Sequence, residues 1–367
     1  MSQVNNNRQP AISLLEGLVA LYSPSGDEHE AAAYLVDWLA ANGFDAHLDD
    51  TGNAVGERGT GPRDVLLMGH IDTFPGELPV YRDGDWLYGR GTVDAKGSLC
   101  AFASAAADVD ISQGWRVKIV AAVEEEIPTS RGARHRLSLD DKPEYVIIGE
   151  PSGWDRIALG YKGVLLGRIS LRLSHSHSAG QSRLPAETAV DCWNAIVDYC
   201  QVVNAERDRE FHRLSPFLRR ISTTDEGAYA SADLEVGFRL PTSFASHDLE
   251  PIISDVLTAT AGEQFEWEVL NREEAFIGEK NSPLVRAFLA AIREKQARPR
   301  FVLKTGTSDM NVVGPVWGCP IVAYGPGDST LDHTPDERID LEEYRQSIEV
   351  LKCALSALMG PETAAGY

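Results

Sequence analysis

Three short apolar segments, each followed at once by charged residues, constrain the fold of this 367-residue chain most. They are 64–70 (DVLLMGH), 115–126 (WRVKIVAAVEEE) and 145–150 (YVIIGE). Continuous apolar runs of this kind are typical of strands buried on both faces, as in a parallel sheet covered by helices. Small apolar residues between Asp94 and Ala107 predict a packed helix among these strands. The pattern therefore predicts an α/β fold with a ligand site at the polar strand ends.

A second pattern begins near Tyr161. Half-exposed alternating strands are predicted at 164–173, 232–240 and 264–269, and helices between them at 185–203 and 247–261. This order predicts a small sandwich with helices on one face, inserted into the α/β domain, whose pattern returns after Ser282. We expect a discontinuous catalytic domain of residues 1–160 plus 273–367 and an inserted domain of residues 161–272.

Charge and cysteine content limit the classes of partner. Lys and Arg number 34 and Asp and Glu number 55, a net charge of −21, so neither nucleic acid nor a membrane is an expected partner. No apolar run approaches the ~18 residues that span a bilayer, and the chain opens on polar residues, which predicts a soluble, cytoplasmic protein. The five cysteines are odd in number and lack CxxC spacing, which favours reduced thiols over disulfides or a zinc knuckle.

Candidate metal-binding residues follow the first predicted strand and a glycine-rich turn. His70 and Asp72 lie two apart at a strand end and project to the same side, so the carboxylate could orient an imidazole that binds a metal. Asp94 lies in the segment 89–97 (GRGTVDAKG), where no GKS or GKT follows and a carboxylate would repel phosphate. Taken singly, the HxD pair is more often a surface pair and Asp94 a helix cap.

Further carboxylates and a histidine follow the other strands. The run Glu124–Glu126 ends an apolar strand, where unpaired carboxylates would be costly unless they bind a cation. Glu150 ends another strand, and His333 follows the glycine-rich loop 324–328. Together these residues suit two divalent metals bridged by one carboxylate, with Zn²⁺, Co²⁺ or Mn²⁺ favoured by the mixed ligands. Such a pair can polarise a carbonyl while a free glutamate serves as general base.

At these residues the chain resembles the M20 family of co-catalytic zinc peptidases and deacylases, which includes acetylornithine deacetylase, succinyl-diaminopimelate desuccinylase and glutamate carboxypeptidases. Five motifs occur in the family's order, from the segment 23–26 (SPSG) to the segment after His333. The resemblance implies a mixed-sheet, di-zinc exopeptidase-like catalytic domain. It also implies that the inserted α+β domain is a ferredoxin-like lid through which two copies form a homodimer.

The resemblance implies a role for each residue of the site. One metal ion would be held by His70, Asp94 and Glu150, and a second by Asp94, Glu126 and His333. Asp72 would orient His70, and Glu125 would be the general base. The family usually shows Asp-Glu-Glu at this run, so a shift of one residue would instead make Glu124 the base and Glu125 the ligand.

Substrate-binding residues are implied for the lid and one loop. The segment 174–178 (SHSHS) resembles the lid segment whose histidine stabilises the oxyanion, and His177 fits it better than His175. Arg239 matches the arginine that binds a substrate carboxylate, for which a guanidinium fork is suited. Thr307 and Ser308 lie in a substrate-facing loop. Without the resemblance, these would be read as exposed strand residues and turn formers.

Three segments resemble the lysine-biosynthesis branch of the family: 304–311 (KTGTSDMN), 317–320 (WGCP) and 324–329 (YGPGDS). Such enzymes release lysine or ornithine from the C-terminal glutamate of an acidic amino-group carrier protein, in lysine and arginine biosynthesis. The alternatives are an N-acetyl-lysine or N-acetyl-ornithine deacetylase and a general aminoacylase or dipeptidase. Basic stretches at 207–220 and 293–304 could steer an acidic carrier, or could be solvated faces.

Overall fold

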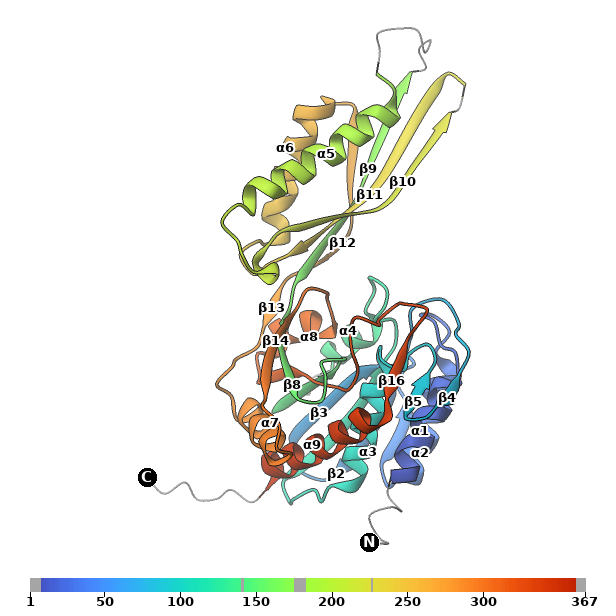
Figure 1. The fold of residues 1–367 in the computed structure, drawn as a ribbon, viewed down its shortest axis with the longest axis vertical. Coiled ribbons are helices and arrows are strands. Elements are labelled where there is room, and N and C mark those ends of the chain that lie inside the picture. The colour runs from blue at the N-terminus through green and yellow to red at the C-terminus, as the bar shows by residue number, and fades with distance from the viewer. Residues whose placement is uncertain (1–7, 140–141, 175–182, 226, 361–367) are drawn as a thin grey trace. The chain divides into compact units, whose positions relative to one another are not determined.

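The structure is a computed structural model that describes residues 8–139, 142–174, 183–225 and 227–360. The chain divides into two compact units: unit 1 comprises residues 1–160, 278–302 and 308–367, and unit 2 comprises residues 161–277 and 303–307 (Figure 1). Unit 2 thus extends five residues beyond the predicted insertion and gains a short segment that the sequence pattern assigned to the catalytic domain. The reason is a long-range pairing, in which the Lys162 amide donates to the Lys304 carbonyl at 3.1 Å.

The main sheet of unit 1 is mixed. Its strands run in the spatial order β1 (Asp45–Leu48), β2 (Ala54–Gly59), β6 (Trp115–Ala122), β3 (Arg63–His70), β7 (Tyr145–Gly149), β15 (Ile321–Ala323) and β8 (Arg156–Tyr161), and β14 (Arg300–Lys304) pairs with β8. The four strands β6, β3, β7 and β15 are parallel. Strand β2 is antiparallel to both β1 and β6, and β8 is antiparallel to β15. The predicted α/β fold with a central mixed sheet is confirmed.

The register of the parallel strands sets the position of the polar residues that follow them. His70 lies opposite Ala122, and Gly69 lies opposite Gly149. Three neighbouring strands therefore end at the same edge of the sheet, where a ligand site is expected. Gly149 permits the close packing there, because a Cβ atom at this position would lie 2.9 Å from the Phe102 ring.

Helices cover this sheet. Those that pack with one another and with the sheet are α1 (Arg8–Val19), α2 (His29–Ala41), α3 (Lys96–Asp108), α7 (Pro283–Glu294) and α9 (Leu341–Met359). Two shorter helices, α4 (Arg131–Leu137) and α8 (Asp309–Trp317), pack against each other and against β6 and β15. A separate small sheet is formed by β4 (Tyr81–Asp83), β5 (Trp86–Tyr88) and β16 (Arg338–Asp340).

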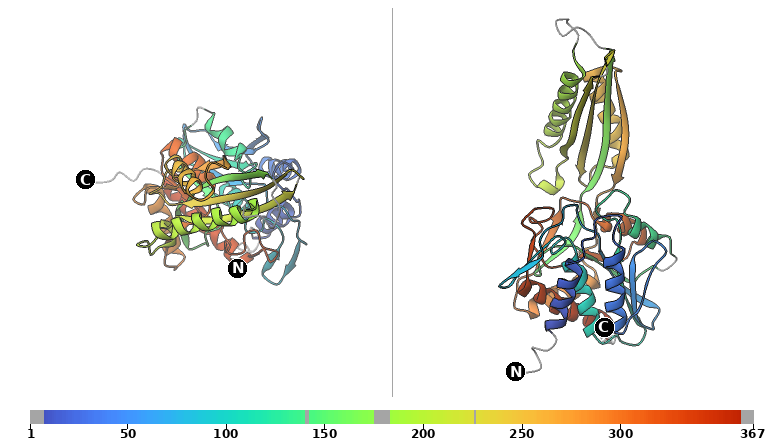
Figure 2. Two further views of the ribbon diagram at one scale, coloured as in Figure 1. Left: turned by 90° about the horizontal axis from the view of Figure 1, so that it is seen from above. Right: turned by 90° about the vertical axis from the view of Figure 1, so that its right-hand side faces the viewer.

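Unit 2 has the chain order β9 (Gly163–Ser174), α5 (Pro185–Val203), β10 (Ser215–Asp225), β11 (Tyr229–Leu240), α6 (Ser246–Ala261) and β12 (Phe265–Glu273), with a 3₁₀ turn at Glu210–His212 and the two-residue strand β13 (Phe276–Ile277). The sheet is antiparallel in the order β10-β11-β9-β12, and the two helices share one apolar core with it (Figure 2). This βαββαβ order is that of a ferredoxin-like unit.

The sequence pattern missed strand β10. This strand lies at the edge of the sheet, and its side chains are half-buried or exposed along its whole length. Arg219 and Arg220 lie on it and are both exposed. An edge strand without a buried face shows no alternation of apolar residues, so the segment was read only as a basic stretch.

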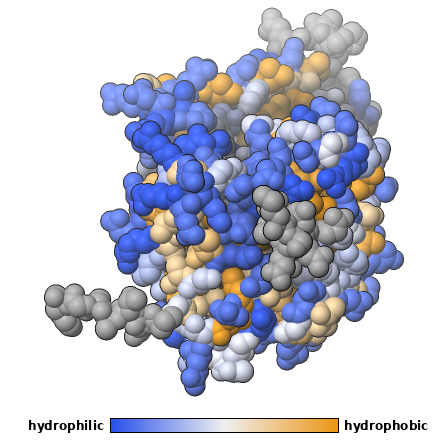
Figure 3. Space-filling model, turned by 60° about the horizontal axis from the view of Figure 1, so that its bottom comes forward, coloured by the Kyte–Doolittle hydropathy of each residue, from blue (hydrophilic) through white to orange (hydrophobic). Residues whose placement is uncertain are grey.

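The face shown in Figure 3 is mostly hydrophilic, with small apolar areas between the polar side chains. All five cysteines are free thiols, as predicted. Within the described part of the chain, no helix combines the length and the apolar character needed to cross a membrane.

Candidate metal centre

Three parallel strands bring four of the predicted site residues to one edge of the sheet. His70 is the last residue of β3, Glu125 and Glu126 follow β6, and Glu150 comes directly after β7. Strands β6, β3 and β7 are direct neighbours. The clustering that the sequence predicted from strand ends therefore follows from the strand order.

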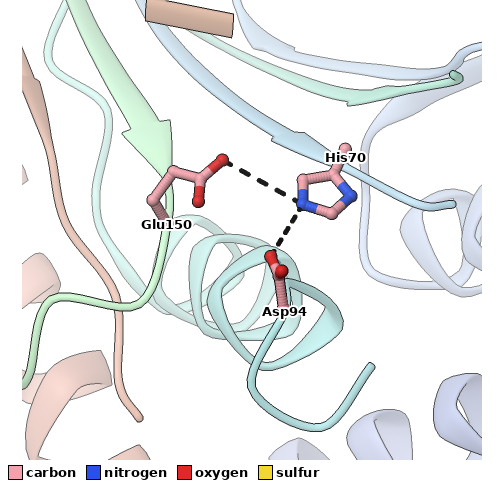
Figure 4. A group of neighbouring side chains, drawn as sticks. All are labelled: His70, Asp94 and Glu150. Carbon is pink, nitrogen blue, oxygen red and sulfur yellow. Dashed lines mark hydrogen bonds and ion pairs between the residues drawn. The ribbon is translucent and has the colours of Figure 1, made fainter. Parts of the chain in front are cut away.

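The first group of possible metal ligands consists of His70, Asp94 and Glu150 (Figure 4). Asp94 comes from the turn before α3, and its Oδ1 atom lies 3.2 Å from His70 Nε2. Glu150 Oε1 lies 4.0 Å from the same nitrogen. Donor atoms around a tetrahedral ion with bonds of about 2.0–2.1 Å are roughly 3.3–3.5 Å apart. The two separations lie on either side of this range, so the three side chains are a candidate ligand group for one small divalent cation.

The second group consists of Asp94, Glu126 and His333. His333 Nε2 lies 3.0 Å from Asp94 Oδ2 and 3.0 Å from Glu126 Oε2. Asp94 therefore belongs to both groups and presents one carboxylate oxygen to each histidine. A carboxylate shared by two sets of nitrogen and oxygen donors could bridge two neighbouring divalent cations.

Asp72 fixes the orientation of His70. The Nδ1–H of His70 donates to the Asp72 backbone carbonyl at 2.9 Å, and the Asp72 carboxylate lies 3.4 Å from the same nitrogen. Both side chains are almost fully buried. Because Nδ1 keeps its proton, Nε2 is the nitrogen that faces Asp94 and Glu150, and loss of the Nε2 proton gives a lone pair that can bind a metal.

The loop of three glutamates is held by buried carboxylates. The Asp72 carboxylate accepts hydrogen bonds from the amides of Glu125 at 3.1 Å and Glu126 at 3.0 Å. Glu28 Oε1 accepts one from the Glu124 amide at 3.2 Å. The hydroxyl of Ser25 also donates to the Asp72 carboxylate, at 2.7 Å.

The side chain of Glu124 points away from both ligand groups. Its carboxylate accepts hydrogen bonds from Arg131 at 2.7 Å and Thr129 at 2.6 Å. The backbone of Glu124 is left-handed, with φ at 60°, so the regular alternation of the strand ends there. This geometry supports the alignment in which Glu126 is the ligand and Glu125 is the free carboxylate.

The electrostatics of the cluster favour a bound cation. Burial raises the pKa of Glu125 and of Glu150 well above the ordinary value, and Glu150 and Asp309 add to the rise at Glu125. Among the groups that shift these two pKa values most, His70 is the only base. A buried set of carboxylates with so little positive charge suits divalent cations, so the residues present fit the implied metal pair.

The pKa values of the two histidines are also raised, but by the neighbouring carboxylates and against the effect of burial. Burial lowers the pKa of His333, but Asp94 and Glu126 outweigh it and raise the pKa to about 10. The same balance, with Asp72 and Asp94 as partners, raises the pKa of His70 well above its ordinary value. The carboxylates around each imidazole therefore favour its protonated form when no cation is bound.

Four further residues were predicted to contact substrate, namely His177, Arg239, Thr307 and Ser308. His177 is outside the described residues. Arg239 lies on β11, and its Nη1 donates to Thr307 Oγ1 at 3.3 Å within unit 2. Ser308 is the N-cap of α8, where its hydroxyl accepts a hydrogen bond from the Met310 amide at 3.2 Å. The substrate roles of these four residues stay predictions.

Several residues that support the centre were not predicted from the sequence. Glu337 accepts hydrogen bonds from the amides of Val93 and Asp94, and Glu28 supports the glutamate loop. Phe74 stacks on the His333 ring, with centroids 4.2 Å apart and planes inclined by 13°. No local pattern marks these contacts. Only the position of Glu337 four residues after His333 hinted at its involvement.

Comparison with known proteins agrees with this geometry. Residues 66–357 match peptidase family M20/M25/M40. The chain belongs to this family, which confirms the family prediction.

Two relatives and one solved structure illustrate the similarity. The LysW-lysine hydrolase of Deinococcus radiodurans is 41% identical over 96% of this chain and 98% of its own. A putative LysW-lysine/LysW-ornithine hydrolase of Pyrococcus abyssi is 38% identical, with 96% and 95% covered. The fold matches the M20 family metallo-carboxypeptidase Sso-CP2 of Sulfolobus solfataricus with a TM-score of 0.79, at 18% identity over 95% of this chain and 99% of that one.

The pKa shifts predict how stability depends on pH. A base whose pKa is raised on folding stabilises the folded state fully at pH values below its pKa in the unfolded chain. This contribution is lost as the pH rises to its pKa in the folded protein, which for His333 means from about 6.5 to about 10. The buried glutamates have raised pKa values and act in the same direction. We expect the Tm of the chelated protein to fall between pH 6 and pH 8.

Added cation should counter this fall. Cation binding displaces the protons, so the rise in Tm caused by added Co²⁺ should be larger at pH 8 than at pH 6. Differential scanning fluorimetry with EDTA and with Co²⁺ at both pH values measures it. A cation-induced rise that is equal at the two pH values would contradict this expectation.

Proposed function

We propose that this chain is a metal-dependent amide hydrolase that releases lysine or ornithine from LysW, the carrier in the names of its relatives. The main support for the proposed chemistry is that Asp94 belongs to two ligand groups, each with a histidine and a further carboxylate. Glu125 lies at the same edge of the sheet. The names of relatives at 41% and 38% identity over almost the whole chain support the substrate.

The proposed metal pair is held by the predicted ligands, with His70, Asp94 and Glu150 for one ion and Asp94, Glu126 and His333 for the other. Histidine and carboxylate donors favour Zn²⁺, and Co²⁺ or Mn²⁺ fit the same set. When bound, the two ions supply Lewis-acid polarisation of a carbonyl and lower the pKa of water.

Glu125 is the proposed general base. Its carboxylate takes a proton from the water that attacks the amide carbon, and it delivers a proton to the leaving nitrogen as the C–N bond breaks. The products are the free amine and the carboxylate of the carrier. The Glu125 amide is anchored on Asp72, so this carboxylate starts from a fixed backbone position.

Unit 2 supplies the remaining proposed contacts. Arg239 would bind a substrate carboxylate, with Thr307 as its neighbour, and His177 would stabilise the oxyanion. We also propose that unit 2 is the dimerisation lid. Its two edge strands, β10 and β12, each leave one side without a partner strand among the described residues, which is a feature that allows pairing between copies.

The experiment is a paired assay on cation-loaded protein. One substrate is LysW that bears a γ-glutamyl-linked lysine or ornithine, and the other is free N-acetyl-lysine or N-acetyl-ornithine. Each is assayed with and without EDTA. We expect chelator-sensitive release from the carrier that exceeds release from the acetylated amino acids by at least tenfold.

The outcomes separate the candidate activities. Release from the acetylated amino acids alone would replace the proposal by a small-molecule deacetylase. Release from neither would redirect it to an aminoacylase or dipeptidase, and release that EDTA leaves unchanged would contradict the metal-dependent mechanism.

A further inference from the structure

A buried ion pair lies directly behind the turn that carries Asp94. Arg90 Nη1 lies 2.7 Å from Glu337 Oε2, and the two side chains are 7% and 0% exposed. Glu337 precedes strand β16, so this pair joins two segments about 250 residues apart in the sequence. Buried ion pairs seldom add net stability over apolar packing, so stability alone is a weak reason for this one.

The second oxygen of Glu337 acts on the Asp94 turn itself. Oε1 accepts hydrogen bonds from the amide of Val93 at 3.0 Å and from the amide of Asp94 at 3.2 Å. The carboxylate therefore accepts hydrogen bonds from two successive backbone amides of the Asp94 turn, while Arg90 balances its charge.

Asp94 has the strictest positional requirement in the metal centre. One of its oxygens lies 3.2 Å from His70 Nε2 and the other 3.0 Å from His333 Nε2. A shift of the turn would disturb both ligand groups together, and functional groups of this kind must be held within about 0.5 Å. The segment that carries Glu337 also carries His333 four residues earlier, so one loop contacts Asp94 at both its amide and its carboxylate.

We propose that Glu337 is a positioning residue of the metal centre, which holds the Asp94 turn through two backbone amides with Arg90 as its buried counter-charge. This role rests on the proposed metal pair but not on the proposed substrate. It assigns Glu337 no contact with a metal or with substrate, and it predicts that changes at Glu337 act on cation binding through Asp94.

The test is a titration of chelator-treated protein with Co²⁺, whose visible absorption reports coordination geometry. The variant E337Q keeps the size of the side chain but loses its charge and one acceptor. We expect its Co²⁺ affinity to fall by about 10–100-fold, with a changed absorption spectrum. Hydrogen exchange at the Val93 and Asp94 amides should be faster than in the wild type before any cation is added.

The matched control is D64N. Asp64 is also a buried carboxylate paired with an arginine, at 2.8 Å from Arg116, but it lies at the opposite end of β3, about 20 Å from His70 at 3.3 Å per residue. We expect D64N to lower the Tm while the Co²⁺ affinity and spectrum stay unchanged. Should E337Q fold poorly, R90K keeps a counter-charge and should show a smaller loss of affinity in the same direction.

Each outcome bears on a different claim. A folded E337Q variant with wild-type Co²⁺ affinity would overturn the positioning role, as would a D64N variant that loses as much affinity. Failure of the wild type to bind Co²⁺ would overturn both this role and the proposed metal centre. Wild-type protein that binds Co²⁺ but does not cleave the carrier would contradict the proposed substrate alone.

Discussion

Replacement of Glu125 by glutamine is expected to lower kcat for release of lysine from the carrier by roughly 10²–10⁴-fold, the range typical of a general base. The amide side chain keeps the shape of the carboxylate but cannot accept the proton of the attacking water. Because Glu125 belongs to neither ligand group, E125Q should still bind two equivalents of Co²⁺. Steady-state kinetics on the carrier substrate and a Co²⁺ titration measure the two effects.

The neighbouring residue provides the matched control. Glu124 is a glutamate in the same run, but its carboxylate pairs with Arg131 and Thr129 and not with the ligand groups. E124Q should retain kcat within about twofold, since a partly exposed ion pair of this kind contributes little. The opposite result, with E124Q inactive and E125Q active, would show that the alternative alignment of the three glutamates is correct.

Replacement of Asp94 by asparagine is expected to disrupt both ligand groups at once. The amide nitrogen would face one of the two histidine nitrogens and cannot donate an electron pair to a cation. D94N should lose the binding of both Co²⁺ equivalents at concentrations that saturate the wild type. Activity should fall by at least about 10³-fold, because Lewis-acid polarisation is worth several kcal/mol and 1.36 kcal/mol is tenfold.

Single-group variants test whether Asp94 is shared. Glu150 belongs only to the first group and Glu126 only to the second. E150Q and E126Q should therefore each weaken one Co²⁺ equivalent and leave the other close to its wild-type affinity. If D94N also lost only one equivalent, Asp94 would not be a bridging ligand.

Much of the fold was predictable because its signals are local. Residues 65–69 and 145–149 form continuous apolar runs, and the strands β3 and β7 that contain them are buried along almost their whole length. Where the signal was not local, prediction failed. Strand β10 has no buried face and shows no periodicity, and the segment 303–307 belongs to unit 2 through a backbone contact with Lys162.

The run Glu124–Glu126 shows that the direction of a single side chain also could not be predicted from local sequence. In a regular strand, Glu124 and Glu126 would point to the same side, so the alternation of side chains could not distinguish the candidate ligand Glu126 from Glu124. The left-handed backbone at Glu124 ends that alternation and sends its carboxylate to Arg131. The distinction depends on contacts with Asp72 and Glu28, which are distant in the sequence.

The sequence by itself determined which residue types stand at the ends of the buried strands, and hence that histidines and carboxylates would meet at one sheet edge. Only the tertiary structure decided that Asp94 lies between His70 and His333, and that Glu337 holds its turn from behind. The physical reason is that strand periodicity is set by neighbours along the chain. The direction of a loop side chain is set by hydrogen bonds from segments that the chain brings together only when it folds.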